Sequence, residues 1–228
     1  MDRPDVHLPD SGRAAACEED PRFARLLDPR DWRRLPAAIR RRFSRHLGPT
    51  GVTTFAGEVA QTRLSLAGRA LGQLARLIGA PLPLEPGGRV AACVVVVEDA
   101  RVAGQRWTRF YARPGRQPQI IHSTKRFAGP TGLEECVGGG IGMWLALAVE
   151  ERSLVFRSRG FFWRVGRRTI RLPDWLTPGL IEVRHREERH GRFSFVLRVT
   201  HPWFGCIVEQ IAFFEDCEPQ STRFAEFG

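Results

Sequence analysis

Apolar and polar residues alternate most regularly late in the chain, between Leu172 and Glu215. Ile181 and Val183 are flanked by polar residues, and apolar residues occupy every second position from Phe193 to Val199. The His190-Gly191 pair between these runs is typical of a turn, so the pattern predicts a β-hairpin followed by a return strand. Because the opposite face carries Arg192, Ser194 and Arg198, we expect one face of this sheet to be packed and the other to face water.

Several strand-like segments precede this hairpin. Val90–Glu98 is a continuous apolar run rich in valine, which predicts a central strand covered on both faces. Val52–Arg63 is a further expected strand, in which Gly57 is expected to mark a bulge. The other expected strands are Gln105–Arg113, Ile120–Phe127, Leu133–Val137, Gly142–Glu151 and Ser153–Phe162. Most of these segments follow one another through short turns, so we expect them to pair antiparallel.

Two segments have apolar residues at helical spacing. In Asp31–Leu47 the apolar residues recur every three or four positions and the other face is strongly basic, which predicts one amphipathic helix capped by Asp31 with Pro36 in its first turns. Leu66–Ile78 shows the same spacing and ends before Pro81, which predicts a second helix. The basic face of the first helix is interpreted as a solvated surface, with a polyanion or membrane surface as the alternative.

Together these elements predict an α+β fold. We expect a strongly curved antiparallel sheet of about eight or nine strands, half-barrel or barrel-like, with the two N-terminal helices packed on it or plugging it. Helix-grip and lipocalin-like binding folds have this general form. Residues 21–217 are expected to form one domain, with flexible tails at 1–20 and 218–228.

Composition narrows the possible chemistry. The net charge is +10, but Lys125 is the only lysine, so the arginine excess is open to two interpretations, a bias of a GC-rich genome or a real polyanion surface. The five cysteines form no CxxC pair and no zinc-ligand spacing, so we expect reduced thiols and no metal. The longest apolar runs, Ala91–Val97 and Ile141–Val149, are too short to span a bilayer, and the N-terminus lacks a signal-peptide pattern. The sequence therefore predicts a cytoplasmic protein.

No catalytic constellation is visible. The glycine-rich run 138–142 fits neither nucleotide-binding motif, so no cofactor is expected. Glu134-Glu135 and Glu187-Glu188 are adjacent in expected strands, where neighbours point to opposite faces and do not form a dyad. The candidate bases are His122, His185 and His201, and His201 at a strand end is the one for which an enzyme is kept as a minor alternative.

Aromatic residues are spread over nearly every expected strand, and two interpretations are open. They fill an ordinary core, or they line an apolar cavity with arginines near its entrance, which would suit an amphipathic anion such as a fatty acid. Binding of nucleic acid is not favoured, because the aromatic residues share faces with Leu and Val. The candidate ligand-binding residues are Trp107, Arg109, Tyr111, Trp144, Phe156, Arg157, Phe193, Phe195 and His201.

Several short motifs, in this order, resemble a bacterial domain family of unknown function, DUF4166. They are Arg106–Phe110 (RWTRF), Arg152–Arg157, Leu172–Pro178 (LPDWLTP), and Gly191–Phe195 (GRFSF) with His201–Gly205 (HPWFG). The resemblance extends from about Phe23 to Glu215 and implies no catalytic residues. Such domains occur alone or fused to short-chain-reductase-like or saccharopine-dehydrogenase-like partners.

Two functions follow as hypotheses. The first is a non-catalytic binding module for a hydrophobic or amphipathic small molecule, which needs an internal cavity. The alternative is an accessory domain that docks onto an oxidoreductase partner through the helix face around Trp32 and Phe43 or through the loop Trp175–Pro178. A solvent-exposed apolar patch without an internal cavity would favour docking.

Overall fold

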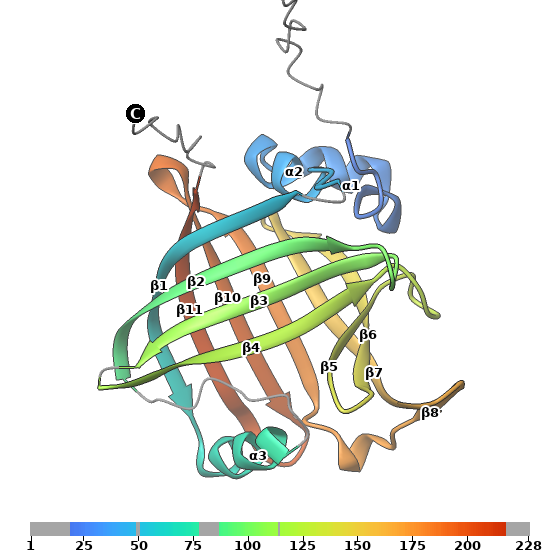
Figure 1. Ribbon diagram of the computed structural model, residues 1–228, viewed down its shortest axis with the longest axis vertical. Helices are drawn as coiled ribbons and strands as arrows, with labels where there is room; N and C mark the ends of the chain where they lie inside the picture. The colour runs from blue at the N-terminus through green and yellow to red at the C-terminus, as the bar shows by residue number, and fades with distance from the viewer. Residues whose placement is uncertain (1–18, 49–50, 78–86, 114, 218–228) are drawn as a thin grey trace, which may run out of the picture.

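The computed structural model describes residues 19–48, 51–77, 87–113 and 115–217, and most of them are in β-strands (Figure 1). The strands are β1 (Val52–Leu64), β2 (Gly87–Asp99), β3 (Gly104–Arg113), β4 (Arg116–Arg126), β5 (Glu134–Gly138), β6 (Ile141–Glu150), β7 (Ser153–Val165), β8 (Arg168–Arg171), β9 (Leu180–Glu187), β10 (Arg192–His201) and β11 (Gly205–Cys217). The predicted terminal tails lie, apart from Glu19 and Asp20, outside the described residues.

The strands form one antiparallel sheet that closes into a barrel. The order is β6-β5-β4-β3-β2-β1-β11-β10-β9-β7-β8. An additional pairing joins β6 to β7, so the ten strands from β6 to β7 in this order close the barrel. The curved antiparallel sheet is therefore confirmed, whereas the expected eight or nine strands were too few. β8 lies outside the barrel and pairs with β7. Its four residues are all exposed, so it has no apolar alternation by which the sequence could reveal it.

The first predicted helix is in fact two short ones, α1 (Pro29–Arg34) and α2 (Ala37–Phe43). Pro36 separates them, because proline excludes the helical conformation at Leu35, whose ψ is 145°. The cap is Asp28 and not Asp31, since the Asp28 carboxylate accepts a hydrogen bond of 2.8 Å from the Arg30 backbone N–H.

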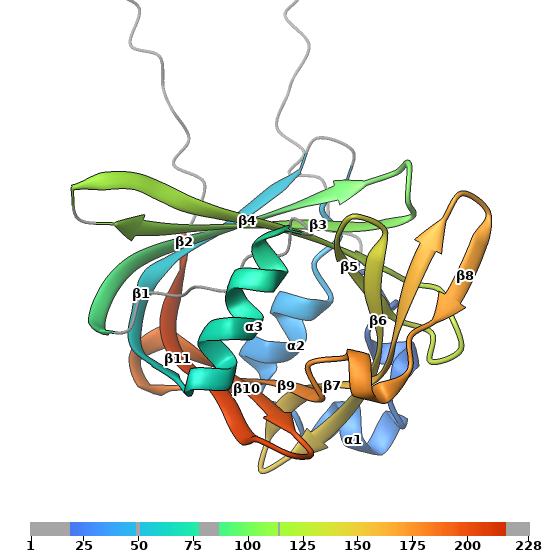
Figure 2. The ribbon, with the colours of Figure 1, turned by 90° about the horizontal axis from the view of Figure 1, so that it is seen from below.

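The second predicted helix is α3 (Leu66–Leu77), and Ile78 lies outside the described residues. It follows β1 in the chain, in the order that the sequence predicted. The helices α1 and α2 cover one end of the barrel and α3 lies at the other, as Figures 1 and 2 show. We call these the cap end and the α3 end.

Two local predictions for the strands need correction. The irregularity in β1 falls between Val59 and Gln61, not at Gly57. Gly57 has another role, because a Cβ there would lie 1.9 Å from the Phe213 carbonyl oxygen, so the two backbones approach too closely for any side chain. The valine-rich β2 is not covered on both faces: Ala92, Val94 and Val96 are buried in the barrel, and the residues between them are half-buried.

The core fills the barrel from the cap end. Phe23, Ile39 and Phe43 are buried beneath the cap and pack with residues of β5, β6 and β7. A second cluster lies within β1, β2, β3, β10 and β11 around Phe55, Trp107 and others. A smaller cluster joins α3 to the ends of β10 and β11. The barrel interior is thus largely occupied by its own side chains.

Candidate functional site

Four polar side chains point into the barrel from three neighbouring strands. Arg109 comes from β3, Ser123 and Lys125 from β4, and Glu135 from β5. The register pairs Trp107 with Ser123 and Lys125 with Glu135, and paired residues share a face of the sheet. Trp107 is buried in the core, so this shared face is the interior. We call the four residues the interior polar cluster.

The cluster is connected by short polar contacts. Lys125 Nζ lies 2.9 Å from Glu135 Oε2, and Ser123 Oγ donates a hydrogen bond of 2.6 Å to Glu135 Oε1. Arg109 Nη1 donates to Ser123 Oγ at 2.9 Å, while Arg109 Nη2 lies 3.5 Å from Glu135 Oε1. The Lys125 ammonium also lies 4.8 Å from the centre of the Trp107 ring, within the range of a cation–π contact. Glu135 is therefore well satisfied, and Arg109 holds it least closely.

The cluster contains two cations and one carboxylate, which leaves it net positive. Burial alone would raise the pKa of Glu135, but the charges of Lys125 and Arg109 and the hydrogen bonds from Ser123 and Lys125 lower it to about 2. Burial lowers the pKa of Lys125, and the nearby Arg109 charge lowers it further, although Glu135 opposes both effects. Such an unbalanced charge is costly inside an apolar barrel.

Arg109 is the member of the cluster that solvent reaches most. Its side chain is 24% exposed, compared with 8% for Lys125 and 10% for Glu135. Four apolar residues on the interior faces of β4, β9 and β10 are also only half-buried. They are Ile121, Val183, Phe195 and Leu197. The interior faces of these three strands are therefore not completely packed.

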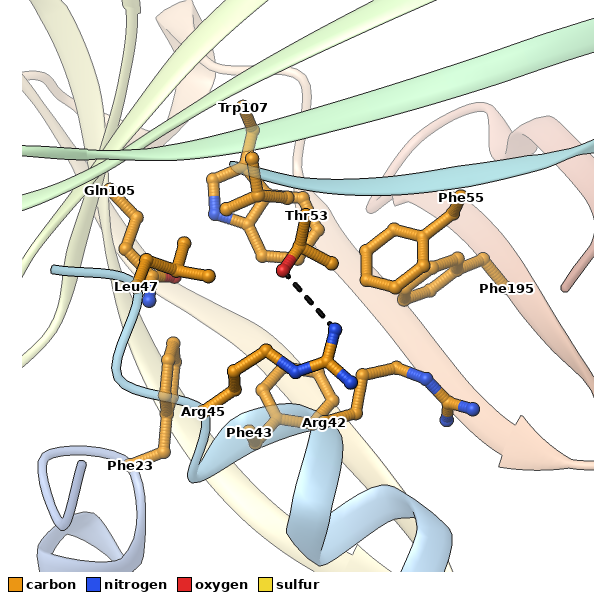
Figure 3. Close-up of a pocket in the computed structure, with 11 residues that line it drawn as sticks. Phe23, Arg42, Phe43, Arg45, Leu47, Thr53, Phe55, Gln105, Trp107 and Phe195 are labelled. Atoms are coloured by element: carbon orange, nitrogen blue, oxygen red, sulfur yellow. Dashed lines mark hydrogen bonds between the residues drawn. The ribbon is translucent and has the colours of Figure 1, made fainter. Parts of the chain in front are cut away.

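A small pocket lies between α2 and the barrel rim, beside the interior polar cluster (Figure 3). Trp107 lies on its barrel side, and Phe43 and Arg45 lie on the side of α2. Arg45 Nη1 donates a hydrogen bond of 3.3 Å to Thr53 Oγ1 across it. Its free volume is about 20 Å³, room for about one water molecule. The Trp107 Nε1–H is buried and has no partner among the described residues.

Arg42 of α2 joins the cap to the barrel. It donates to Asp216 at 2.7 Å and to Glu187 at 3.1 Å, and it lies 3.0 Å from His185 Nε2. Its guanidinium carbon sits 3.8 Å from the centre of the Phe193 ring. Burial and the Arg42 charge hold the pKa of His185 well below its usual value, so this imidazole is neutral. We call this arrangement the Arg42 clasp.

The structure brings six of the nine predicted ligand-binding residues into the interior. They are Trp107, Arg109, Tyr111, Phe156, Phe193 and Phe195. Arg157 follows Phe156 in β7 and therefore faces outward, where it pairs with Glu150 at 2.6 Å and Glu182 at 2.7 Å. Trp144 is also on the outer face and packs on the Phe162 ring, with centroids 5.2 Å apart.

His201 lies at the end of β10, away from the interior polar cluster. Its Nδ1 accepts a hydrogen bond of 3.2 Å from the Trp203 backbone N–H, and its ring stacks on Phe204 at 4.8 Å. The described contacts of this imidazole thus belong to the local turn. Its role in a reaction stays a prediction.

Sequence reasoning missed Ser123, Lys125 and Glu135. Lys125 stands out in the sequence as the only lysine, but the residues next to it do not show that it is buried. The two adjacent glutamates do point to opposite faces: Glu135 belongs to the interior polar cluster, and Glu134 pairs with Arg126 and Arg164 instead.

The predicted docking surfaces differ in exposure. Phe43 is 5% exposed and belongs to the core, so the helix face that contains it is already occupied. In the loop Trp175–Pro178, Trp175 is 67% exposed.

Fold and interior together define a closed antiparallel β-barrel with a net positive polar cluster inside it. The family model described as "Domain of unknown function (DUF4166)" matches residues 35–214, so the chain belongs to this family, as its motifs indicated. The match begins at Leu35 and leaves α1 outside it. No curated protein matches the chain.

Two negative findings apply to the part of the chain that the structure describes. None of its helices is long and apolar enough to cross a membrane. It also contains no group of three or more His, Cys, Asp and Glu residues that could hold a metal ion.

Proposed function

We propose that this chain is a binding module for a small amphipathic anion, which the barrel takes into its interior with the anionic head group at Arg109. The observation that carries the proposal is the net positive interior polar cluster, whose most accessible member is this arginine. An anion would neutralise a charge that is otherwise costly to bury.

The contacts of Arg109 would allow it to leave Ser123 and Glu135 and bind a ligand anion instead. Its shorter contact is to the neutral hydroxyl of Ser123, and its contact to Glu135 is long, at 3.5 Å. Glu135 keeps Lys125 and Ser123 when Arg109 turns away. A guanidinium can then hold a ligand carboxylate through two parallel hydrogen bonds.

The half-buried apolar residues on the interior faces of β4, β9 and β10 would receive the tail of the ligand. They supply a wall from β4, β9 and β10, and each methylene buried against such a wall contributes roughly 0.8 kcal/mol. The pocket beneath α2 is too small for a tail, because its free volume of about 20 Å³ is far below the roughly 300 Å³ typical of small-molecule sites. We therefore place the tail in the middle of the barrel rather than under the cap.

The test is a fluorescence titration of the full chain with 8-anilinonaphthalene-1-sulfonate, an amphipathic anion, followed by displacement with decanoate or decanol. We expect decanoate to displace the probe at lower concentration than decanol. Arg109→Gln should weaken binding of decanoate about tenfold or more, because a hydrogen bond to a charged group contributes about 1.5–3 kcal/mol.

Arg106 provides the matched control. It lies on the same strand but on the outer face, its side chain is 54% exposed, and it pairs with Asp99 at 2.7 Å. Arg106→Gln removes the same charge without touching the interior, so it should bind decanoate like the unmodified chain. Equal loss in both variants, or equal competition by decanol, would refute an anion site at Arg109.

A further inference from the structure

Large apolar side chains are exposed together at the α3 end of the barrel. Leu66 begins α3, Trp175 and Leu176 lie in a short 3-10 helix (Asp174–Leu176), Leu180 begins β9, and Trp203 and Phe204 form the β10–β11 turn. Their exposed fractions are 84% for Leu66, 67% for Trp175, 59% for Leu176, 45% for Leu180, 72% for Trp203 and 60% for Phe204. We call these six residues the α3-end rim.

The segments of the rim are neighbours in space. The Ser65 backbone N–H donates to the Ile207 carbonyl at 3.1 Å, which holds the start of α3 beside the β10–β11 turn. Leu180 pairs with Thr200 across β9 and β10, which brings the 3-10 helix segment to the same end. Figures 1 and 2 show these turns and α3 together, opposite the cap.

Such a concentration of exposed apolar residues is unusual. Single exposed apolar residues are ordinary on protein surfaces, whereas gathered ones mark interaction sites. The rim contains two of the six tryptophans of the chain. Trp203 and Phe204 stand at a turn, and both rings contact the neighbouring His201 ring.

The charge around the rim is strongly positive. The segments 63–69, 163–180 and 198–209 contain seven arginines and only two carboxylates, Asp174 and Glu209. Both Arg63 and Arg198 pair with Glu209, and Arg164 pairs with Glu134. Arg69, Arg167, Arg168 and Arg171 are exposed. The α3 end thus presents apolar tips within a basic surround.

We propose that the α3-end rim docks this protein onto an anionic lipid surface. Tryptophan is enriched at the membrane–water interface, and arginine near a membrane is attracted by anionic head groups. The exposed apolar residues come from four separate segments of the chain and lie beside exposed arginines, so apolar insertion and attraction to anionic head groups can act at the same end of the barrel. The inference goes beyond the proposed interior ligand and does not depend on it.

The test is flotation of the full chain with vesicles of phosphatidylcholine alone or mixed with phosphatidylglycerol. We expect binding to the mixed vesicles, at least about tenfold stronger than to phosphatidylcholine alone, and a marked loss when the salt is raised to 0.5 M. The double variant Trp203→Ala, Phe204→Ala should weaken binding about tenfold. Val52→Ala at the cap end is the matched control, because Val52 is also exposed, at 55%, and should leave binding unchanged.

A second double variant keeps the test decisive if the first does not fold. Arg167→Gln with Arg168→Gln changes two exposed residues in the β7–β8 turn and should reduce binding to anionic vesicles severalfold. Absence of binding to anionic vesicles by the folded chain would overturn the proposal. It would also be overturned if the rim variants bound as well as the unmodified chain.

Two other occupants of the rim are distinguished by the same samples. A dimer that rim substitutions convert to a monomer in light scattering, without vesicle binding, would assign the rim to a second copy. Capture of a reductase-like partner by the rim, again without vesicle binding, would assign it to a protein. Arg109→Gln should retain vesicle binding, so failure of the interior site and failure of the rim are separate results.

Discussion

The two ends of the barrel use the same kinds of residue in opposite ways. At the cap end, phenylalanine rings and an arginine close the interior. At the α3 end, aromatic rings and arginines remain exposed. The comparison teaches that the position of a side chain relative to the barrel axis, rather than its type, decides whether it stabilises the fold or is available to a partner.

The cap end is closed by aromatic packing and by charge together. Phe23 and Phe43 are 1% and 5% exposed, and their rings meet edge to face with centroids 5.2 Å apart. The Arg42 clasp fixes α2 to the ends of β9 and β11. The aromatic contacts supply apolar burial, and the clasp fixes where the helix sits. At the α3 end, by contrast, Arg198 and Glu209 form a salt bridge of 2.7 Å in which the arginine is 56% exposed.

Removing one ring from each end should give the largest contrast. Phe43→Ala should lower the free energy of unfolding by about 3–5 kcal/mol, because it removes a buried ring and leaves a cavity beneath the cap. Trp203→Ala should change it by less than about 0.5 kcal/mol, because the side chain is 72% exposed. Urea denaturation followed by circular dichroism measures both. Similar losses at the two sites would contradict the view that Phe43 belongs to the core and Trp203 to an exposed surface.

The buried and exposed ion pairs provide the next contrast. Lys125→Met should cost about 3 kcal/mol, because it leaves Glu135 buried with a more distant cation as its remaining partner charge. Adding Glu135→Gln to Lys125→Met should restore part of this loss, which a double-mutant cycle in urea would show. Arg198→Gln, at the exposed pair, should cost less than about 1 kcal/mol. If Lys125→Met and Arg198→Gln cost the same, the interior polar cluster does not depend on its charge balance.

Apolar patterning was sufficient to predict most strands of the barrel, but it could not reveal β8. In β10 every second residue from Phe193 to Val199 is apolar, and the structure turns these residues inward. Closure of the barrel could not be predicted from the sequence, because it depends on the pairing of β1 with β11, which are distant in the chain. The first helix was misjudged because periodicity outweighed Pro36, which divides it.

Only some residues of the candidate site were predicted, because the apolar pattern does not always show which face of a strand is interior. In β7 apolar residues occupy both faces of the strand, so alternation does not tell which face is interior. Phe156 points inward and its neighbour Arg157 outward, yet both were selected. Lys125 could not be placed because its partner Glu135 lies on another strand, and their contact depends on the register of β4 with β5. Exposure of the rim also depends on tertiary structure, since a tryptophan in a turn is equally consistent with a core.

At the cap end we also expect a smaller loss of stability at low pH, caused by His185. The pKa of His185 in the folded protein is held well below 6.5, so the unfolded chain binds a proton here that the folded chain rejects. The contribution of His185 to the free energy of unfolding is therefore fully present above pH 6.5. It falls as the pH drops below that value, by at most about 1.4 kcal/mol per pH unit. His185→Phe should reduce this acid sensitivity, because phenylalanine can occupy the aromatic surroundings of Phe43, Phe193 and Phe195 without titrating. The measurement is urea denaturation at pH 7.5 and pH 5, with His122→Gln, on the exposed outer face, as the control. If the two variants lose stability equally between these pH values, the neutral imidazole beneath the Arg42 clasp is not the group that makes the cap end sensitive to acid.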